Sequence, residues 1–304
     1  MKKDFKWRKV VPRTALLFTA LVLFTISAAQ AQKFYLRAGG GYSIQSGKTE
    51  FNNADPNGIT GITQSTDITS NGNTTTIKSL NGTVGEGFKF TLAPGYMFNP
   101  YIGAEIGINY FHGNEVLIGR LSTPSRHAEE NTYLRGVDLT PAIVITPGFA
   151  KLNPYARVGA IFPAAGHLTI NTDITQYATG SSPQIDVNAE TEVKAKFTVG
   201  FIGALGVLYP VSDKVSIFGE VEFKNFSIQS KNAEIKKYST TATSENQSSL
   251  VPGQQLGDLP VNQKKFTFNE TYTPSNDTNQ PKQVPQQYVN ASGLGLNLGI
   301  RLSF

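Results

Sequence analysis

The sequence predicts an all-β fold, an antiparallel up-and-down β-barrel of eight membrane-crossing strands. Three observations predict it. Segments of about 10 to 16 residues alternate apolar and polar side chains, long polar stretches separate them, and no long apolar run follows residue 31. The connections between segments alternate between short and long, which is typical of transmembrane barrels with an even number of strands.

Residues 1–31 have the pattern of a signal peptide that is cleaved after Ala31. A basic stretch over residues 2–13 precedes an apolar core over residues 15–26, and Ala29-Gln30-Ala31 supplies the small residues that signal peptidase accepts. The apolar core is shorter than the roughly 20 residues that a membrane-spanning helix needs, which weighs against an N-terminal anchor. We therefore expect a leader, residues 1–31, and one exported barrel domain, residues 32–304.

Composition excludes several classes of protein. The chain has 27 basic and 22 acidic residues, but six of the basic and one of the acidic residues lie in the leader, so the exported part has 21 of each. Without a net positive charge it lacks the electrostatic footprint of a nucleic-acid-binding protein. The absence of cysteine excludes an acylated lipoprotein, a disulfide framework and cysteine metal sites.

The last segment of the chain has the clearest strand pattern. One face is apolar up to the final residue, and the other carries glycine and polar residues. The apolar face consists of Leu294, Leu296, Leu298, Ile300, Leu302 and Phe304. The same alternation places seven earlier strands at about residues 34–44, 87–98, 101–111, 133–145, 155–162, 193–209 and 215–228. Pro94 and Pro141 interrupt two of them and suggest bulges.

The connections set the topology of the barrel. Three are short, at residues 99–100, 147–154 and 210–214, and are predicted to be periplasmic turns. Four are long and are predicted to be extracellular loops: residues 45–86, 113–132, 163–192 and 229–287. Within the last of these, residues 265–272 alternate well, so they either extend the seventh and eighth strands or form an extra hairpin that raises the strand count to ten.

The interior of the predicted barrel carries charge. An eight-stranded barrel is just wide enough for side chains to fill, and charges in so confined a space must be paired. We expect one internal ion-pair network from inward residues at similar heights: Arg37, Glu105, Arg157, Glu220 and Arg301. A sealed plug is the favoured interpretation of this network, and a gated ion or proton path is the alternative.

Enzymatic and metal sites are not indicated. The chain has three histidines, His112, His127 and His167, and none belongs to a His-x-Ser pair of the kind that lipid-modifying barrel enzymes use. The loop aspartates lack the spacing of a calcium-binding loop. We expect no catalytic residue, no cofactor and no metal.

The leader, the eight alternating segments, the prolines in the second and fourth strands and the terminal Ser303-Phe304 together resemble the small OmpA- and OmpX-type outer-membrane β-barrel family. The resemblance implies a location in the bacterial outer membrane, with outer-membrane lipid and lipopolysaccharide as neighbours. It also implies that the barrel assembly machinery reads a C-terminal signal formed by Leu298, Ile300, Leu302 and Phe304. The chain departs from OmpA because it stops at the last strand, so the periplasmic peptidoglycan-binding domain is expected to be missing.

These observations predict an integral outer-membrane barrel with a structural or surface-interaction role, exerted through its long outer loops. A narrow pore for small solutes or ions is the alternative. A lipid-modifying enzyme is a second and weaker alternative.

Overall fold

The structure is a computed structural model that describes residues 33–304, apart from 48, 52–59, 61, 63 and 246. The predicted signal peptide lies outside the described residues. Among the described helices, none is both long enough and apolar enough to cross a membrane.

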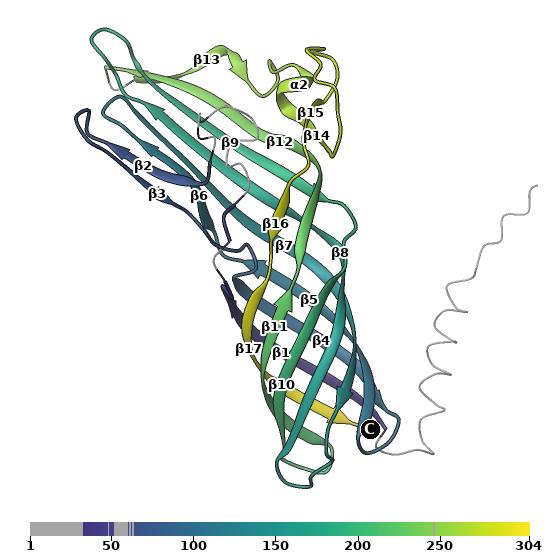
Figure 1. The fold of residues 1–304 in the computed structure, drawn as a ribbon. Helices are drawn as coiled ribbons and strands as arrows, with labels where there is room; N and C mark the ends of the chain where they lie inside the picture. Colours follow the sequence, from purple (N-terminus) through teal and green to yellow (C-terminus); the bar gives the residue numbers. More distant parts are fainter. Residues whose placement is uncertain (1–32, 48, 52–59, 61, 63, 246) are drawn as a thin grey trace, which may run out of the picture.

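Eight strands close into one antiparallel barrel, which confirms the predicted fold class (Figure 1). The first strand, β1 (Phe34–Ile44), pairs on one side with β4 (Gly87–Met97) and on the other with the last strand, β17 (Gly293–Ser303). The wall continues in order through β5 (Ile102–Gly113), β7 (Arg126–Ile145), β8 (Asn153–Gln176), β10 (Gly200–Pro210) and β11 (Val215–Asn225), and β11 pairs with β17 to close it.

Alternation along each strand decides which side chains line the barrel. In β1, Tyr35 and Arg37 point inward and are buried, while on β17 the outward Leu296 and Leu298 are about 60% exposed, as lipid-facing residues are. The two prolines interrupt the ladders, because proline has no amide hydrogen to donate, but neither forms the bulge that the sequence suggests, since the register is the same on both sides of each gap. Pairing between β4 and β5 lapses at Pro94, and pairing between β7 and β8 lapses at Pro141.

Three short turns lie at the end of the barrel that holds the C-terminus (Figure 1). They connect β4 to β5, β7 to β8, and β10 to β11, as the sequence predicts. In the first turn Asn99 Oδ1 accepts hydrogen bonds from the backbone amides of Tyr101 and Ile102, each at 2.8 Å, a local bond that asparagine favours in turns. By the rule that outer-membrane barrels keep their short turns in the periplasm, this end is the periplasmic one.

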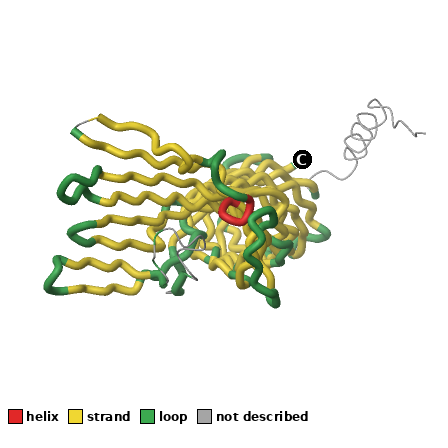
Figure 2. Tube along the Cα trace, turned by 90° about the horizontal axis from the view of Figure 1, so that it is seen from above, coloured by secondary structure: helices red, strands yellow, loops and turns green. Residues whose placement is uncertain are grey.

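The four long connections at the other end contain strands, which corrects the expectation of loops. β7 and β8 run well beyond the predicted residues 133–145 and 155–162, and further elements pair above the barrel. These elements are β2 (Thr66–Ser70), β3 (Thr75–Ser79), β6 (Val116–Ser122), β9 (Gln184–Ala195), β12 (Ser227–Ser244), β13 (Gln247–Gln255), α2 (Val261–Lys264), β14 (Lys265–Asn269), β15 (Lys282–Pro285) and β16 (Tyr288–Asn290). We call this part, with residues 126–133 of β7 and 168–176 of β8, the extension; its hairpins fan out to one side of the barrel (Figure 2).

The extension folds because its polar segments also bury side chains. Phe266 and Phe268 on β14 are 2% and 1% exposed and belong to one buried apolar cluster with Ile170 of β8 and Ile235 of β12. Burial of such residues outweighs the ordering cost of the threonine-rich strands around them. The alternating segment at residues 265–272 therefore forms β14, which pairs with β12 and β15 above the barrel, so the barrel has eight strands and not ten.

Candidate functional site

Four of the five residues predicted for the lumen meet at its centre. Arg37 on β1, Glu105 on β5, Arg157 on β8 and Glu220 on β11 are each 4% exposed or less. They come from four different strands that the barrel brings together, and strand alternation turns all four inward. The four residues also lie at similar distances along their strands from the periplasmic turns, so their side chains can contact one another across the lumen.

The ion pairs form a closed cycle among these four residues. Arg37 Nη2 lies 2.7 Å from Glu105 Oε1, and Arg37 Nη1 lies 3.3 Å from Glu220 Oε1. Arg157 Nη2 lies 2.6 Å from the same Glu220 oxygen, and Arg157 Nε lies 3.6 Å from Glu105 Oε1. Each guanidinium therefore contacts both carboxylates, which is the arrangement that buried charges require.

Two further residues belong to the network and were not assigned to it from the sequence. Glu222, two positions after Glu220 on the same face of β11, accepts from Arg157 Nη2 at 2.7 Å and pairs with Lys89 of β4. The network then holds three cations and three carboxylates, so its charges balance. Strand alternation places both Lys89 and Glu222 on the inward face, so the sequence could have indicated their part in the network. A buried arginine has five N–H donors, and Arg157 therefore needs more acceptors than Glu105 and Glu220 provide.

Arg301 is placed differently from the expectation. Within the described residues it forms no salt bridge, and its guanidinium carbon lies 3.8 Å from the centre of the Tyr35 ring. Arg301 is the register partner of Arg37 on the neighbouring strand, so the two cations lie directly opposite each other. The oxygens of Glu105 and Glu220 already accept from Arg37, Arg157, Tyr35 and Tyr155, and stacking on the Tyr35 ring gives Arg301 a different contact.

Tyrosine hydroxyls complete the network. Tyr35 donates to Glu105 Oε2 at 3.0 Å and Tyr155 donates to Glu220 Oε2 at 2.9 Å. Both rings fit because a glycine faces each one: a Cβ on Gly95 would lie 2.2 Å from the Tyr35 ring, and a Cβ on Gly206 would lie 2.5 Å from the Tyr155 ring. The inward glycines thus make room for large side chains that fill the lumen.

A second polar layer lies on the outer side of the network. Asn109 Nδ2 donates to Asp138 Oδ1 at 2.6 Å and to Thr140 Oγ1 at 2.7 Å. Its Oδ1 accepts from Thr91 Oγ1 at 2.7 Å. Thr91 lies on β4, Asn109 on β5, and Asp138 and Thr140 on β7, three strands that are adjacent in the wall, so this layer covers one side of the lumen.

The histidines do not form a hydrolytic arrangement. His112 packs with Tyr110, His127 Nε2 lies 3.8 Å from Glu129 Oε2, and His167 lines a cavity beside β8. Among the described residues no hydrogen bond joins a histidine to a serine hydroxyl, and no group of three acidic or histidine side chains is placed to hold a metal ion.

The C-terminal residues form part of the outer wall. Leu298, Ile300 and Phe304 are 62%, 44% and 60% exposed, and Leu302 is partly buried. The amide of Phe304 donates to the carbonyl of Phe34 at 3.0 Å, so the last residue is held beside the first strand.

Comparison with known proteins identifies a family. The family model described as outer membrane protein beta-barrel domain matches residues 16–243. No curated protein matches the chain.

Several solved structures share the fold at low sequence identity. A major outer membrane protein from Thermus thermophilus is 11% identical, with a TM-score of 0.34, covering 90% of this chain and 100% of that chain. CarO2 of Acinetobacter baumannii is 12% identical, with a TM-score of 0.32, covering 89% and 99%. The outer membrane protease OmpT from Escherichia coli is 9% identical, with a TM-score of 0.32, covering 90% and 98%. Likenesses of this size carry no argument about the chemistry of this chain.

Proposed function

This chain belongs to the outer membrane protein β-barrel domain family, and from that premise we propose that it is a non-enzymatic barrel whose sealed lumen supports a surface-interaction role. The protein is located in the bacterial outer membrane. In our proposal the barrel anchors the chain and the extension provides the working surface.

The observation that carries the proposal is the buried, charge-balanced network across the lumen. An ion path needs mobile or water-exposed polar groups, whereas Arg37, Arg157 and Glu220 have side chains that are 5% exposed or less and are bonded to one another. Moving one of them aside would leave its partner buried and unpaired, which is costly. The network therefore supports a plug over the alternative of a narrow pore.

The extension supports the surface role. It is an ordered structure with its own apolar core, and it also exposes apolar side chains, including Ile77 at 65% and Leu250 at 62%. An ordered surface that a rigid barrel holds outside the membrane is a common location for binding residues. We propose outer-membrane lipid and lipopolysaccharide as neighbours of the barrel wall, and the barrel assembly machinery as a partner of Leu298, Ile300, Leu302 and Phe304 during insertion.

Shortening the four outer connections to tight turns tests whether the barrel only anchors the chain and the extension makes the contacts with other molecules. We expect the trimmed barrel to insert, to keep its heat-modifiable mobility on gels, and to leave small-solute uptake by intact cells unchanged. A photo-crosslinking residue at Ile77 or Leu250 should give a discrete protein or lipopolysaccharide adduct, while one at the lipid-facing Leu205 should crosslink only to lipid. Uptake that changes when the extension is trimmed would support the pore instead.

A further inference from the structure

The wall of the barrel opens between β8 and the strand next to it. Near the membrane β8 pairs with β10, ending at Ile161 opposite Gly200, and in the extension it pairs with β9, starting at Leu168 opposite Val193. The two pairings share one register, so β9 and β10 continue a single strand with no residue inserted. Residues 162–167 and 194–199, all of which the structure describes, nevertheless form no backbone ladder with each other, and the rings of Phe162 and Phe197 stack across the gap with centroids 6.3 Å apart.

The sequence of β8 explains the opening. The shared register sets Pro163, which has no amide hydrogen, opposite Thr198. Ala164 is a bulge in the pairing with β7. Gly166 has a φ of +143°, a backbone conformation that residues other than glycine rarely adopt. The hydroxyl of Thr198 is buried without a hydrogen-bond partner in the described structure. We call this opening the slit.

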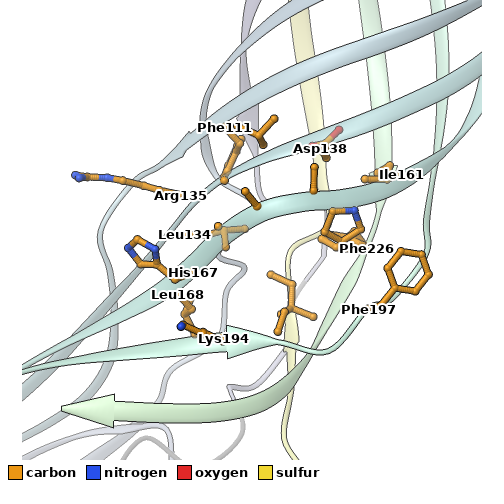
Figure 3. A pocket seen from close by; sticks show the side chains of 18 of the residues that line it. Phe111, Leu134, Arg135, Asp138, Ile161, His167, Leu168, Lys194, Phe197 and Phe226 are labelled. Carbon is orange, nitrogen blue, oxygen red and sulfur yellow. The ribbon is translucent and has the colours of Figure 1, made fainter. Parts of the chain in front are cut away.

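The slit leads into a cavity of about 360 Å³. This volume is at the small end of the roughly 300–1,000 Å³ typical of small-molecule sites, so it suits one chain and not a two-chain lipid. Apolar side chains on both sides line it, including Ile161, Leu168, Phe197 and Phe226. Figure 3 shows His167 and Leu168 on one strand, Lys194 and Phe197 on the facing segment, and Phe226 between them.

The slit lies at the outer limit of the lipid-facing band. Phe197 and Tyr209 are both exposed and are twelve residues apart along the strand. At about 3.3 Å per residue and a tilt of about 40°, this separation spans roughly 30 Å, against an apolar band of about 25 Å. With Tyr209 at the periplasmic boundary, Phe197 reaches the level of the outer head groups. Unpaired backbone is tolerated there because polar groups are within reach.

The charges around the cavity are unbalanced. Four basic residues line it, Arg135, Lys194, Lys196 and Lys224, against one carboxylate, Asp138. The Arg135 guanidinium stacks on the Tyr133 ring and Lys196 donates to Gln286 Oε1, so Lys194 and Lys224 are the two cations on which the excess charge rests. The Asp138 carboxylate already accepts hydrogen bonds in the second polar layer of the lumen. The ammonium of Lys224 lies over the Phe111 ring at 4.3 Å and forms no salt bridge within the described residues. The cavity thus joins an apolar lining to an excess of positive charge.

We propose that the slit and its cavity bind a single-chain amphiphile with a carboxylate head group. The alkyl chain lies against Phe226 and Leu168 and leaves through the slit beside Phe197, while the head group meets Lys194 and Lys224. Because the ion-pair network closes the lumen below the cavity, the bound molecule exchanges with the outer leaflet or the cell exterior and not with the periplasm.

Fluorescence quenching tests this site. The only tryptophan, Trp7, lies in the predicted leader, so Phe197→Trp introduces a single reporter into the described chain. The protein, purified from the outer membrane, is placed in nanodiscs of zwitterionic lipid and titrated with dibromostearate or with its uncharged methyl ester. Phe201→Trp is the matched control, because Phe201 faces lipid on the same strand and does not line the cavity.

We expect saturable quenching of the Phe197→Trp variant by the carboxylate, with a half-saturation about tenfold below that of the ester. Adding Lys194→Glu and Lys224→Met to this variant should abolish the preference, and the Phe201→Trp control should show only partition-dependent quenching for both probes. Equal and non-saturating quenching at both positions would overturn the site. Saturable, lysine-dependent quenching by a brominated phosphatidylglycerol would overturn the single-chain assignment.

Discussion

Arg157 Nη2 lies 2.6 Å from Oε1 of Glu220 and 2.7 Å from Oε2 of Glu222, so one nitrogen joins two carboxylates of β11. Through its contact with Glu105, the same guanidinium links β11 to β5 on the opposite side of the lumen. Arg157 therefore contacts all three carboxylates of the network, whereas Arg37 contacts two and Lys89 one. The Arg157 side chain is 4% exposed, so water cannot take the place of these contacts.

Removing Arg157 should destabilise the barrel strongly. Arg157→Ala leaves Glu220 and Glu222 buried with fewer partners, and we expect the free energy of unfolding to fall by about 3–5 kcal/mol. Urea titration of the barrel folded into lipid vesicles measures it. Arg120→Ala is the matched control: Arg120 also contacts two carboxylates, but its side chain is 35% exposed, and the loss should stay below about 1 kcal/mol. Equal losses would contradict the assignment of the network.

A methyl group added inside the lumen should act through a tyrosine. In Gly206→Ala the new Cβ would lie 2.5 Å from the Tyr155 ring, so the ring must move away from Glu220, and we expect a loss of about 1–3 kcal/mol. Gly203→Ala on the same strand meets nothing within 4 Å and should be nearly neutral. The same urea titration compares the two, and a neutral Gly206→Ala would show that the Tyr155 contact does not constrain the lumen.

The extension should respond to pH through Asp173. Partial desolvation of the Asp173 carboxyl, which remains exposed on one side, together with the charges of Glu129 and Glu115, raises its pKa above the usual value, and Glu129 is its register partner. A raised carboxyl pKa means that the folded state binds the proton more tightly, so this contribution to stability is lost as the pH rises through the usual aspartate range toward the raised pKa. Asp173→Asn should therefore increase amide-exchange protection of β7 and β8 at neutral pH and have little effect near pH 3.

Asp186 provides the control for that experiment. It accepts hydrogen bonds from Thr175 Oγ1 at 2.7 Å and from Gln184 Nε2 at 2.9 Å. Asp186→Asn weakens these charge-assisted bonds, so protection at neutral pH should fall. A gain of protection in both variants would show that general loss of negative charge, and not the pair of Asp173 with Glu129, is responsible.

The C-terminal residue should matter for assembly more than for stability. Deleting Phe304 removes a half-exposed side chain and one backbone hydrogen bond, so refolding into vesicles should be nearly unchanged. In cells, we expect the heat-modifiable fraction of the protein to fall several-fold, because the proposed signal for the assembly machinery is lost. Ser303→Ala should have no effect in either assay. Equal defects in cells and in vesicles would indicate a purely structural role.

The barrel was predictable because strand alternation is a local signal that the membrane enforces. The C-terminal strand from Gly293 to Ser303 and the first strand from Phe34 to Ile44 match their predicted bounds within about one residue. The ends of β7 and β8 were not predictable in the same way. Above the membrane the residues on the outward face of each strand are polar as well. Successive residues such as Asn171 and Thr172 of β8 then have similar hydropathy, so the alternation that reveals a strand in the sequence is lost.

The lumen was predictable in part for the same reason. Counting from the turns places Arg37, Glu105, Arg157 and Glu220 at one height, but it does not choose among several inward charges. The contact of Arg301 with the Tyr35 ring depends on which rotamers fit beside a like charge, and sequence spacing does not contain that information. The slit results from Pro163, the bulge at Ala164 and the positive φ of Gly166. The sequence shows these residues, but a break in the wall can be predicted from them only when the register of the neighbouring strand is known.

The central claim is that the network seals the lumen, and single-channel conductance in planar bilayers tests it most directly. We expect no conductance from the wild-type protein. Arg157→Ala and Glu220→Ala, if they still fold, should also remain silent, because Arg37 still pairs with Glu105, and Lys89 of β4 still pairs with Glu222 of β11 across the lumen. Steady conductance in the wild type, altered in size or ion selectivity by either substitution, would contradict the plug and make the protein a pore.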